Sequence, residues 1–278
     1  MILLNEYVVD FGRFPNGESN LNFNKLAFST KSTITLKYES DQDLFNLFIL
    51  KKYLDEYAQF NRFDLTILYM PYSRMDRHNI VYTFNLKYVC TMINDMNFAS
   101  VTVYDAHSDV TGALLNRYIE GGNIPILFKQ FQEEVGTDNL VIMYPDAGAQ
   151  KRYSKDYNYP TVVGNKIRNF ETGNIDSYEI YGEDVKGKNV VIIDDLCSKG
   201  GTFIGAAKAL RERGAKDVYL IVGHCENTVY DGDLFSHITK MYTTNTILSD
   251  INIARQIISK EQLTIIPSYV IKSREEGY

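Results

Sequence analysis

The chain has 278 residues, 45% of them hydrophobic and 23% charged, which is typical of a globular protein large enough for two domains. Its formal net charge of −6 gives no support for nucleic-acid binding, and no apolar stretch is long enough to cross a bilayer. Met1–Asp10 lacks the basic and apolar regions of a signal peptide, and three cysteines without metal-ligand spacing argue against a disulfide framework. We therefore expect a cytoplasmic protein that binds neither nucleic acid nor membranes.

Apolar runs alternate with helical patterns along the chain, which predicts mostly parallel sheets flanked by helices. In the first half, the patterns predict helices over Asp43–Gln59 and Asn85–Met96 and strands over Asp64–Met70 and Ser100–Tyr104. In the second half, they predict a helix over Thr202–Arg213 and strands over Asn139–Tyr144, Thr161–Gly164, Asn189–Ile193, Asp217–Gly223 and Leu263–Ile266. The fold class is thus α/β with two similarly folded domains. A link beginning at Gly121–Pro125 places these domains at 1–127 and 128–278.

The stretch with the most specific pattern covers residues 190–202. Val190–Ile193 is an apolar, β-branched run that predicts a buried strand, and it ends at the adjacent carboxylates of Asp194 and Asp195. A short loop follows, in which Ser198, Lys199, Gly200, Gly201 and Thr202 lead into the predicted helix. Carboxylates can accept hydrogen bonds from neighbouring sugar hydroxyls. Glycines let backbone N–H groups approach an anion at a helix N-terminus. The pattern favours a ribose-phosphate site over an ordinary strand-end turn.

This stretch resembles the phosphoribosyl-diphosphate-binding motif of the type I phosphoribosyltransferase fold. Three further segments are similar to those of one family with that fold, the ribose-phosphate pyrophosphokinases. They are Gly12–Glu18, Pro71–Arg77 and Pro145–Arg152, and they occur in the family's order. Asp105–His107 and Thr244–Ile247 add two weaker matches. Plain phosphoribosyltransferases share residues 190–202 but lack the other segments.

The resemblance implies that the chain transfers the β,γ-diphosphate of ATP to the anomeric hydroxyl of ribose 5-phosphate, with Mg²⁺ as cofactor. Lys166 and Arg168 match a Lys-x-Arg pair that the family carries on a mobile loop, and they are the expected catalytic cations. The acceptor would be held by the set named above: Asp194, Asp195, Ser198, Lys199, Gly200, Gly201 and Thr202. His107 and Asp146 match the residues that place Mg²⁺.

The same resemblance assigns the ATP side to the first half of the chain. Its expected ATP-binding residues are Phe14, Asn16, Glu18, Arg74, Met75, Asp76 and Arg77. Phe14 would stack on adenine; the alternative, a core aromatic, is disfavoured by the neighbouring Gly, Pro and Asn. In the family this segment reaches a neighbouring subunit's site, which implies a homodimer or a higher homo-oligomer. Met75 replaces the family's glutamine, which removes a hydrogen-bonding group.

Ser198 and Lys199 depart from the family, which has Asp-Thr at these positions. Replacing the carboxylate and adding a lysine makes the loop more positive by about two charges. Such a loop would suit ADP-ribose, an acceptor used by one branch of the family. The alternative is sequence drift in a loop that still binds ribose 5-phosphate through its backbone N–H groups, and it is favoured because the backbone does most of the phosphate binding. More distant alternatives are a phosphoribosyltransferase, which would leave Arg74–Arg77 without a role, and a non-catalytic relative, which would be expected to lose Lys166 and Arg168.

Overall fold

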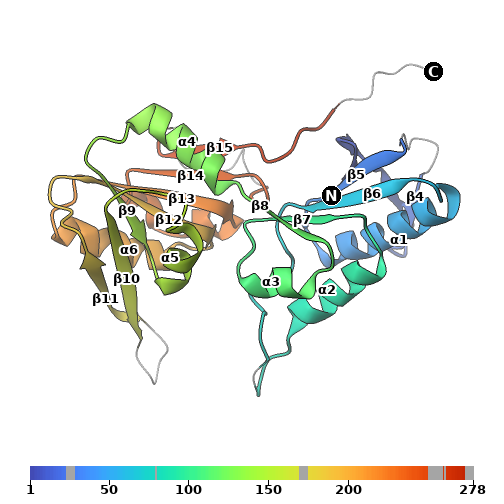
Figure 1. Ribbon diagram of the computed structural model, residues 1–278, viewed down its shortest axis with the longest axis horizontal. Coiled ribbons are helices and arrows are strands. Elements are labelled where there is room, and N and C mark those ends of the chain that lie inside the picture. The colour runs from blue at the N-terminus through green and yellow to red at the C-terminus, as the bar shows by residue number, and fades with distance from the viewer. Residues whose placement is uncertain (23–28, 79, 169–174, 250–258, 260, 273–278) are drawn as a thin grey trace. The chain divides into compact units, whose positions relative to one another are not determined.

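A computed structural model of the chain describes residues 1–22, 29–78, 80–168, 175–249, 259 and 261–272; the side chains of 166–168 and 175–177 lie outside this description. It confirms the α/β class, with two compact units that each contain a mostly parallel sheet and flanking helices (Figure 1). Unit 1 consists of Met1–Gly122 and Pro267–Tyr278, and unit 2 consists of Asn123–Ile266. No helix among the described residues is long and apolar enough to cross a membrane.

The observed division differs from the expected one in two places: unit 2 begins at Asn123 and not at residue 128, and it ends at Ile266 and not at residue 278. Strand β8 (Tyr118–Gly121) closes unit 1, and helix α4 (Ile124–Val135) opens unit 2 almost at once, so the expected linker is partly helical. After residue 266 the chain returns to unit 1, where the backbone N–H of Lys272 donates to the carbonyl of Glu6 over 3.0 Å. The Lys37 ammonium also lies 5.7 Å from the ring centre of Tyr269. Residues 267–272, expected in the second domain, therefore pack with the first.

Unit 1 is built on a six-stranded sheet in the order β2-β1-β5-β6-β7-β8. Its further strands are β1 (Ile2–Leu4), β2 (Tyr7–Val8), β5 (Lys31–Leu36), β6 (Arg62–Ile67) and β7 (Val101–Tyr104). Strands β5 to β8 are parallel, whereas β1 is antiparallel to both of its neighbours. Three helices connect the strands: α1 (Asp41–Tyr57), α2 (Asn85–Asp95) and α3 (Asp109–Leu114).

The sheet of unit 1 has one strongly apolar face. In β5, the alternate residues Ile34 and Leu36 are buried and belong to one core with Leu47 of α1 and Leu86 of α2. This alternation follows from the period of two in strand side chains. The intervening residues include Thr33 and Thr35 of β5 and Thr66 of β6, and these threonines line a hollow of ≈ 430 Å³ together with Ser268–Val270.

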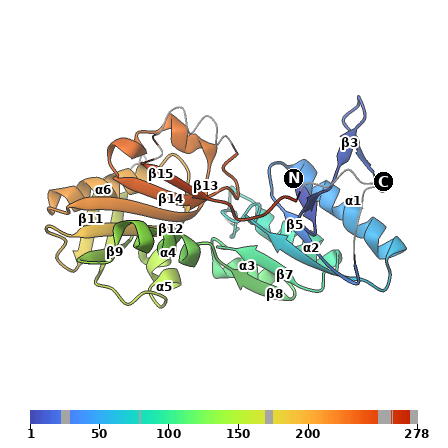
Figure 2. The ribbon, with the colours of Figure 1, turned by 90° about the horizontal axis from the view of Figure 1, so that it is seen from above.

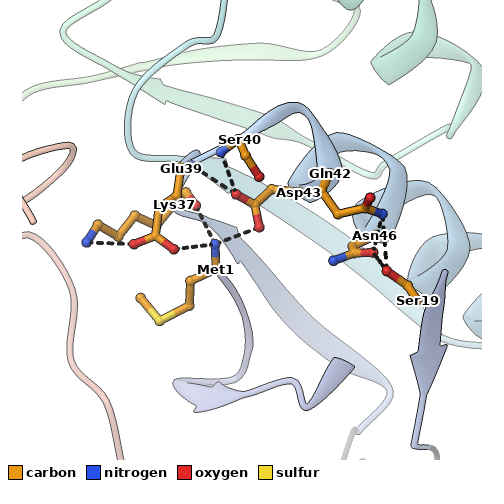
Figure 3. Close-up of polar contacts among 8 residues, drawn as sticks. All are labelled: Met1, Ser19, Lys37, Glu39, Ser40, Gln42, Asp43 and Asn46. Atoms are coloured by element: carbon orange, nitrogen blue, oxygen red, sulfur yellow. Dashed lines mark hydrogen bonds and ion pairs between the residues drawn. The ribbon is translucent and has the colours of Figure 1, made fainter. Parts of the chain in front are cut away.

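A small hairpin of β3 (Phe11–Arg13) and β4 (Ser19–Leu21) presents the segment expected to hold adenine (Figure 2). Its turn is closed by the backbone N–H of Phe14, which donates to the Glu18 carbonyl over 2.9 Å. Ser19 Oγ donates to Asn46 Oδ1 of α1 over 2.6 Å, and Gln42 of α1 donates to Ser19 over 3.1 Å. These bonds fix the base of the hairpin on α1 (Figure 3).

The start of α1 is held by a charged cluster (Figure 3). Asp43 accepts hydrogen bonds from the backbone N–H groups of Glu39 and Ser40, which satisfies donors that a helix N-terminus leaves unpaired. The Met1 amino group lies 2.8 Å from Asp43 Oδ1 and 3.1 Å from Glu39 Oε2. The cluster joins β1 to α1 next to the hairpin.

Unit 2 contains a seven-stranded sheet in the order β11-β10-β9-β12-β13-β14-β15, in which only β11 is antiparallel to its neighbour. Its strands are β9 (Leu140–Tyr144), β10 (Thr161–Arg168), β11 (Ile175–Gly182), β12 (Asn189–Cys197), β13 (Asp217–Cys225), β14 (Lys240–Thr244) and β15 (Leu263–Ile266). Its helices are α4, α5 (Ala147–Tyr153) and α6 (Gly201–Glu212), with the 3₁₀ turns η2 (Asn227–Asp231) and η3 (Leu234–Ser236).

The central strands of unit 2 are covered on both faces. Val190 and Ile192 of β12 belong to a core with α6, whereas Val191 and Ile193 belong to a second core with α4. This two-sided burial is the physical reason why residues 190–193 are continuously apolar. It also fixes the position of the carboxylates that follow.

Candidate active site

The candidate acceptor residues lie at the carboxyl end of β12. This strand continues to Cys197, four residues beyond its predicted end, because Leu196 and Cys197 pair in register with His224 and Cys225 of β13. Asp194 and Asp195 therefore belong to the strand, and their side chains point to opposite faces. Each carboxylate consequently has a different environment.

Asp195 is buried and forms an ion pair with Arg152 at the end of α5, with 3.0 Å between Arg152 Nη1 and Asp195 Oδ1. Burial lowers the pKa of Arg152, but the charge of Asp195, together with Tyr153 and the hydrogen bonds to both residues, outweighs burial and raises the pKa above its ordinary value. The guanidinium thus stays positive. Its role in this arrangement is to pair with the buried Asp195 carboxylate and hold it in place.

Among the described residues, the groups that most shift the pKa of Asp194 include no cation. Burial, followed by the Asp195 charge, raises the pKa of Asp194 well above its ordinary value, and Asp146 acts in the same direction. Asp146 caps α5, where its Oδ1 accepts the N–H of Ala149 over 3.0 Å. The structure therefore brings three expected site residues of unit 2 into one electrostatic neighbourhood: Asp146, Asp194 and Asp195.

The loop after β12 has the open backbone that an anion site requires. Gly200 adopts a left-handed conformation with φ of 83° and caps α6, where a side chain would be strained. A Cβ on Gly201 would meet nothing within 4 Å, so the first turn of α6 is accessible from this side. The helix N-terminus has unpaired N–H groups and a favourable dipole for a phosphate.

Ser198 does not offer its hydroxyl proton to a ligand in this structure. Its Oγ donates to Glu226 Oε2 over 2.5 Å, and Thr228 Oγ1 lies 3.1 Å from Ser198 Oγ and 3.2 Å from the same Glu226 oxygen. Both hydroxyl protons are thus used inside the cluster. Glu226 also places a negative charge beside the loop, so the expected gain of about two positive charges is partly offset. Lys199 is exposed.

Lys166 and Arg168 lie on a strand and not on the expected loop. The backbone of β10 runs to Arg168, and Lys166 pairs in register with Tyr178 of the antiparallel strand β11. The expected strand ended at Gly164, since the polar residues after it resemble a loop. The side chains of Lys166 and Arg168 lie outside the described residues.

In unit 1, the expected ATP-binding residues follow β6. Arg74 and Arg77 are exposed, whereas Asp76 is buried. Burial raises the pKa of Asp76, but the interaction with the Ser108 hydroxyl, the 3.1 Å hydrogen bond from Arg77 Nε and the charges of Arg77 and His107 together bring it below its ordinary value. Asp76 is therefore ionised and organises its neighbours. Its position does not favour direct contact with ATP.

The same region contains two strained backbone positions. Tyr72 and Asp105 have φ values of 60° and 43°, a region that residues other than glycine rarely adopt. Asp105 follows β7 directly and places His107 near Asp76. Strain of this kind is typical of functional loops. Met75 packs toward α2, where Asn85 donates to its sulfur over 3.5 Å.

Phe14, Asn16 and Glu18 lie in the turn of the β3–β4 hairpin and are exposed, and 51% of the Phe14 side chain is accessible. Phe14 is therefore not a core residue, in agreement with the expected loop. The Asn16 side chain accepts the backbone N–H of Glu18 over 3.2 Å, so it shapes the turn.

Comparisons with known proteins agree with this geometry. Residues 163–271 match the family model described as "Phosphoribosyl synthetase-associated domain". The chain is 29% identical over 261 residues to the ribose-phosphate pyrophosphokinase of Pyrococcus abyssi, which covers 88% of this chain and 86% of the relative. It is also 29% identical to that of Thermococcus kodakarensis over 222 residues, covering 78% and 77% of the two chains. The chain is thus similar to ribose-phosphate pyrophosphokinases over most of its length.

A similar fold is also found in a solved structure. The phosphoribosylpyrophosphate synthetase from Mycobacterium smegmatis has a TM-score of 0.73 at 22% identity, covering 94% of this chain and 86% of the other. This likeness concerns the fold, which confirms the expected arrangement of two phosphoribosyltransferase-like units.

The sequence did not predict that three further residues belong to the candidate site. Arg152 stands inside a recognised segment, but a lone arginine does not reveal that its partner is Asp195, 43 positions away. Glu226 and Tyr178 lie in no recognised motif. Only the register of β13 beside β12, and of β11 beside β10, brings them to the site.

The oxygen donors of this site fit a Mg²⁺ ion whose coordination shell is completed by substrate phosphates. Among the described residues there is no cluster of three or more His, Cys, Asp or Glu side chains that could hold a metal alone. Mg²⁺ commonly takes one or two carboxylates together with substrate phosphates and water. Asp146 and Asp194 offer such oxygens. Burial, followed by the charges of Asp195 and Asp146, raises the pKa of Asp194, and a bound cation would favour its ionised form.

Proposed function

We propose that this chain transfers the β,γ-diphosphate of ATP to the anomeric hydroxyl of ribose 5-phosphate, giving phosphoribosyl diphosphate and AMP. The observation that carries the proposal is the end of β12. There, a buried and charge-paired Asp195 stands next to Asp194 and is followed by an open glycine loop at the start of α6. This combination suits a ribose with its 2- and 3-hydroxyls on the carboxylates and its 5-phosphate on the loop.

In this reaction the anomeric oxygen attacks the β-phosphorus, the bond from that phosphorus to the bridging α,β-oxygen breaks, and the anomeric proton is lost to solvent or base. Asp195, paired with Arg152, would accept hydrogen bonds from the ribose hydroxyls. Backbone N–H groups of residues 200–202 would bind the 5-phosphate. Lys166 and Arg168 would neutralise the charge that grows on the bridging oxygen.

The ATP side would be formed by unit 1, with Arg74 and Arg77 on the triphosphate and Phe14 stacked on adenine. Mg²⁺, when bound, would neutralise phosphate charge and align the diphosphate. Asp146 and His107 match the family's metal-placing residues, and Asp194 is a further oxygen donor. Supporting this assignment, His107 is close enough to Asp76 to lower its pKa.

The charges around the Ser198–Lys199 loop favour ribose 5-phosphate over ADP-ribose as the acceptor. The argument for ADP-ribose depended on a more cationic loop, and Glu226 offsets part of that charge. Homo-oligomer formation stays a prediction from the Phe14–Glu18 segment, and light scattering of the purified protein would test it.

The deciding experiment is incubation with ATP, Mg²⁺ and ribose 5-phosphate in the absence of any nucleobase. We expect equal amounts of AMP and phosphoribosyl diphosphate, resolved by anion-exchange chromatography. A phosphoribosyltransferase or a non-catalytic relative would release no AMP, and that result would contradict the proposal. Omission of Mg²⁺, with EDTA present, should abolish product formation.

A further inference from the structure

Tyr178 of β11 crosses β10 and reaches the other side of the candidate site. Its hydroxyl donates to the Pro145 carbonyl over 2.7 Å. On the way, the side chain passes Gly164 of β10, where a Cβ would lie 2.1 Å from the Tyr178 oxygen. A contact this short is impossible, so only glycine leaves room for Tyr178 at this point.

The ring is also bounded by α6. A Cβ on Gly205 would lie 3.5 Å from the Tyr178 ring, which is an ordinary van der Waals contact. Tyr178 packs against the core that contains Ala206 and Val162. The phenol therefore packs between β10 and α6, and its hydroxyl donates to the Pro145 carbonyl.

Both ends of this connection belong to the candidate site. Tyr178 pairs in register with Lys166, and Pro145 directly precedes Asp146. Burial, followed by the charges of Asp146 and Asp194, raises the pKa of Tyr178. The phenol consequently stays protonated and remains a donor at all physiological pH values.

We propose that Tyr178 is a positioning residue that fixes the β10–β11 hairpin, which carries Lys166 and Arg168, to the Pro145–Asp146 side of the acceptor site. The inference rests on the proposed function, because it concerns the catalytic cations of that reaction. The Lys166–Tyr178 pair lies near the turn end of the hairpin, two residues before Arg168, so fixing Tyr178 restrains the backbone that carries both cations. Tying Tyr178 to Pro145 thus limits how far the cations can move from the carboxylates.

The first test compares Tyr178→Phe with Tyr181→Phe. Tyr181 lies on the same strand, is 56% exposed and donates its hydroxyl proton to neighbouring Glu179, so it is a matched control. We expect Tyr178→Phe to lower kcat about tenfold with little change in the KM for ATP or ribose 5-phosphate, since mispositioned cations act mainly in the transition state. Tyr181→Phe should leave kcat within about twofold.

The second test uses hydrogen exchange and does not depend on activity. The backbone amides of β10 that pair with β11 should exchange about tenfold faster in Tyr178→Phe than in the wild type or in Tyr181→Phe. If the wild type releases no AMP, the proposed function fails and exchange alone decides the tether. If the wild type is active but Tyr178→Phe has normal kcat and normal exchange, the positioning role is wrong and the proposed function stands.

A glycine pair separates positioning from general folding defects. Gly164→Ala should reproduce the loss in kcat, because its methyl group takes the space of the Tyr178 hydroxyl, whereas Gly205→Ala should have little effect. In a Tyr178→Val background, which vacates this space, Gly164→Ala should cause no further loss. An equal loss of kcat in the Gly164→Ala and Gly205→Ala variants would contradict the proposal.

Discussion

In unit 2, the candidate residues Asp194 and Asp195 end a strand that is covered on both faces, and Asp195 is buried against Arg152. In unit 1, Arg74 and Arg77 stand exposed on a loop after β6, and Phe14 is exposed at a hairpin turn. The residues proposed to hold the acceptor are therefore packed into a sheet core, whereas those proposed to hold ATP lie on exposed turns and loops. A packed site suits the hydroxyl contacts that would orient a sugar, and exposed loop residues suit contacts with a long triphosphate.

The largest effect should come from breaking the charge pair of unit 2. Arg152→Ala leaves the Asp195 carboxylate buried and unpaired, and we expect a loss of about 3–5 kcal/mol in the free energy of unfolding. Chemical denaturation followed by circular dichroism measures it. Lys31→Ala is the control from unit 1, because Lys31 is 81% exposed and lies 3.8 Å from Asp64, which predicts a change within about 0.5 kcal/mol. An equal loss in the free energy of unfolding for both variants would show that the buried charge pair of unit 2 stabilises the protein no more than an exposed pair of unit 1.

The next effect concerns the hairpin cations. Lys166→Ala and Arg168→Ala should each lower turnover by about a hundredfold or more, since a donor aimed at developing charge contributes about 3 kcal/mol to the transition state. Single-turnover formation of AMP would measure the change, with melting temperature as the control for folding. Near-normal turnover in both variants would remove this hairpin from the mechanism.

A smaller effect is expected on the ATP side. Arg74→Ala should raise the KM for ATP about tenfold, corresponding to loss of a charge-assisted hydrogen bond, and leave the KM for ribose 5-phosphate unchanged. Initial-rate kinetics with each substrate varied separately would test this. If the KM for ribose 5-phosphate rises instead, the assignment of ATP to unit 1 is wrong.

Asp194→Asn should stabilise the protein by about 1 kcal/mol at neutral pH while reducing its activity. Because the pKa of Asp194 is higher in the folded protein than its ordinary value of 3.8, the folded state binds a proton more readily than the unfolded chain. Wild-type stability is therefore fully penalised above the raised pKa, and the penalty disappears as the pH falls to the ordinary value. Melting curves from pH 4 to 8 should show the advantage of Asp194→Asn growing with pH. An advantage that is independent of pH would contradict the carboxylate explanation.

The smallest effect concerns acceptor preference. Glu226→Gln removes a negative charge beside the loop and should improve kcat/KM for ADP-ribose relative to ribose 5-phosphate by about threefold. Competition between the two acceptors in one tube measures the ratio, with the exposed Glu183→Gln as control. A wild type that prefers ADP-ribose would contradict the charge argument and favour the alternative acceptor.

The sequence by itself determined the strands and helices with strong local periodicity. The predicted strand Leu263–Ile266 matches β15, and helix Asn85–Met96 differs from α2 by one residue. Residues 190–202 also predicted the sugar-phosphate site, because an apolar run, two carboxylates and glycines are adjacent in the chain. Patterns of this kind depend on neighbours within a few residues, which the sequence displays directly.

Only the tertiary structure decided the long-range pairings. The extension of β12 to Cys197 depends on its register with β13, and the extension of β10 to Arg168 depends on its antiparallel partner β11. Helix α4 replaces part of an expected linker, since its apolar face is satisfied only by packing on the sheet of unit 2. The pairing of Arg152 with Asp195, of Glu226 with Ser198 and of Tyr178 with Pro145 joins positions 28 to 43 residues apart. Such contacts arise from chain folding, and no local pattern encodes which residues will meet.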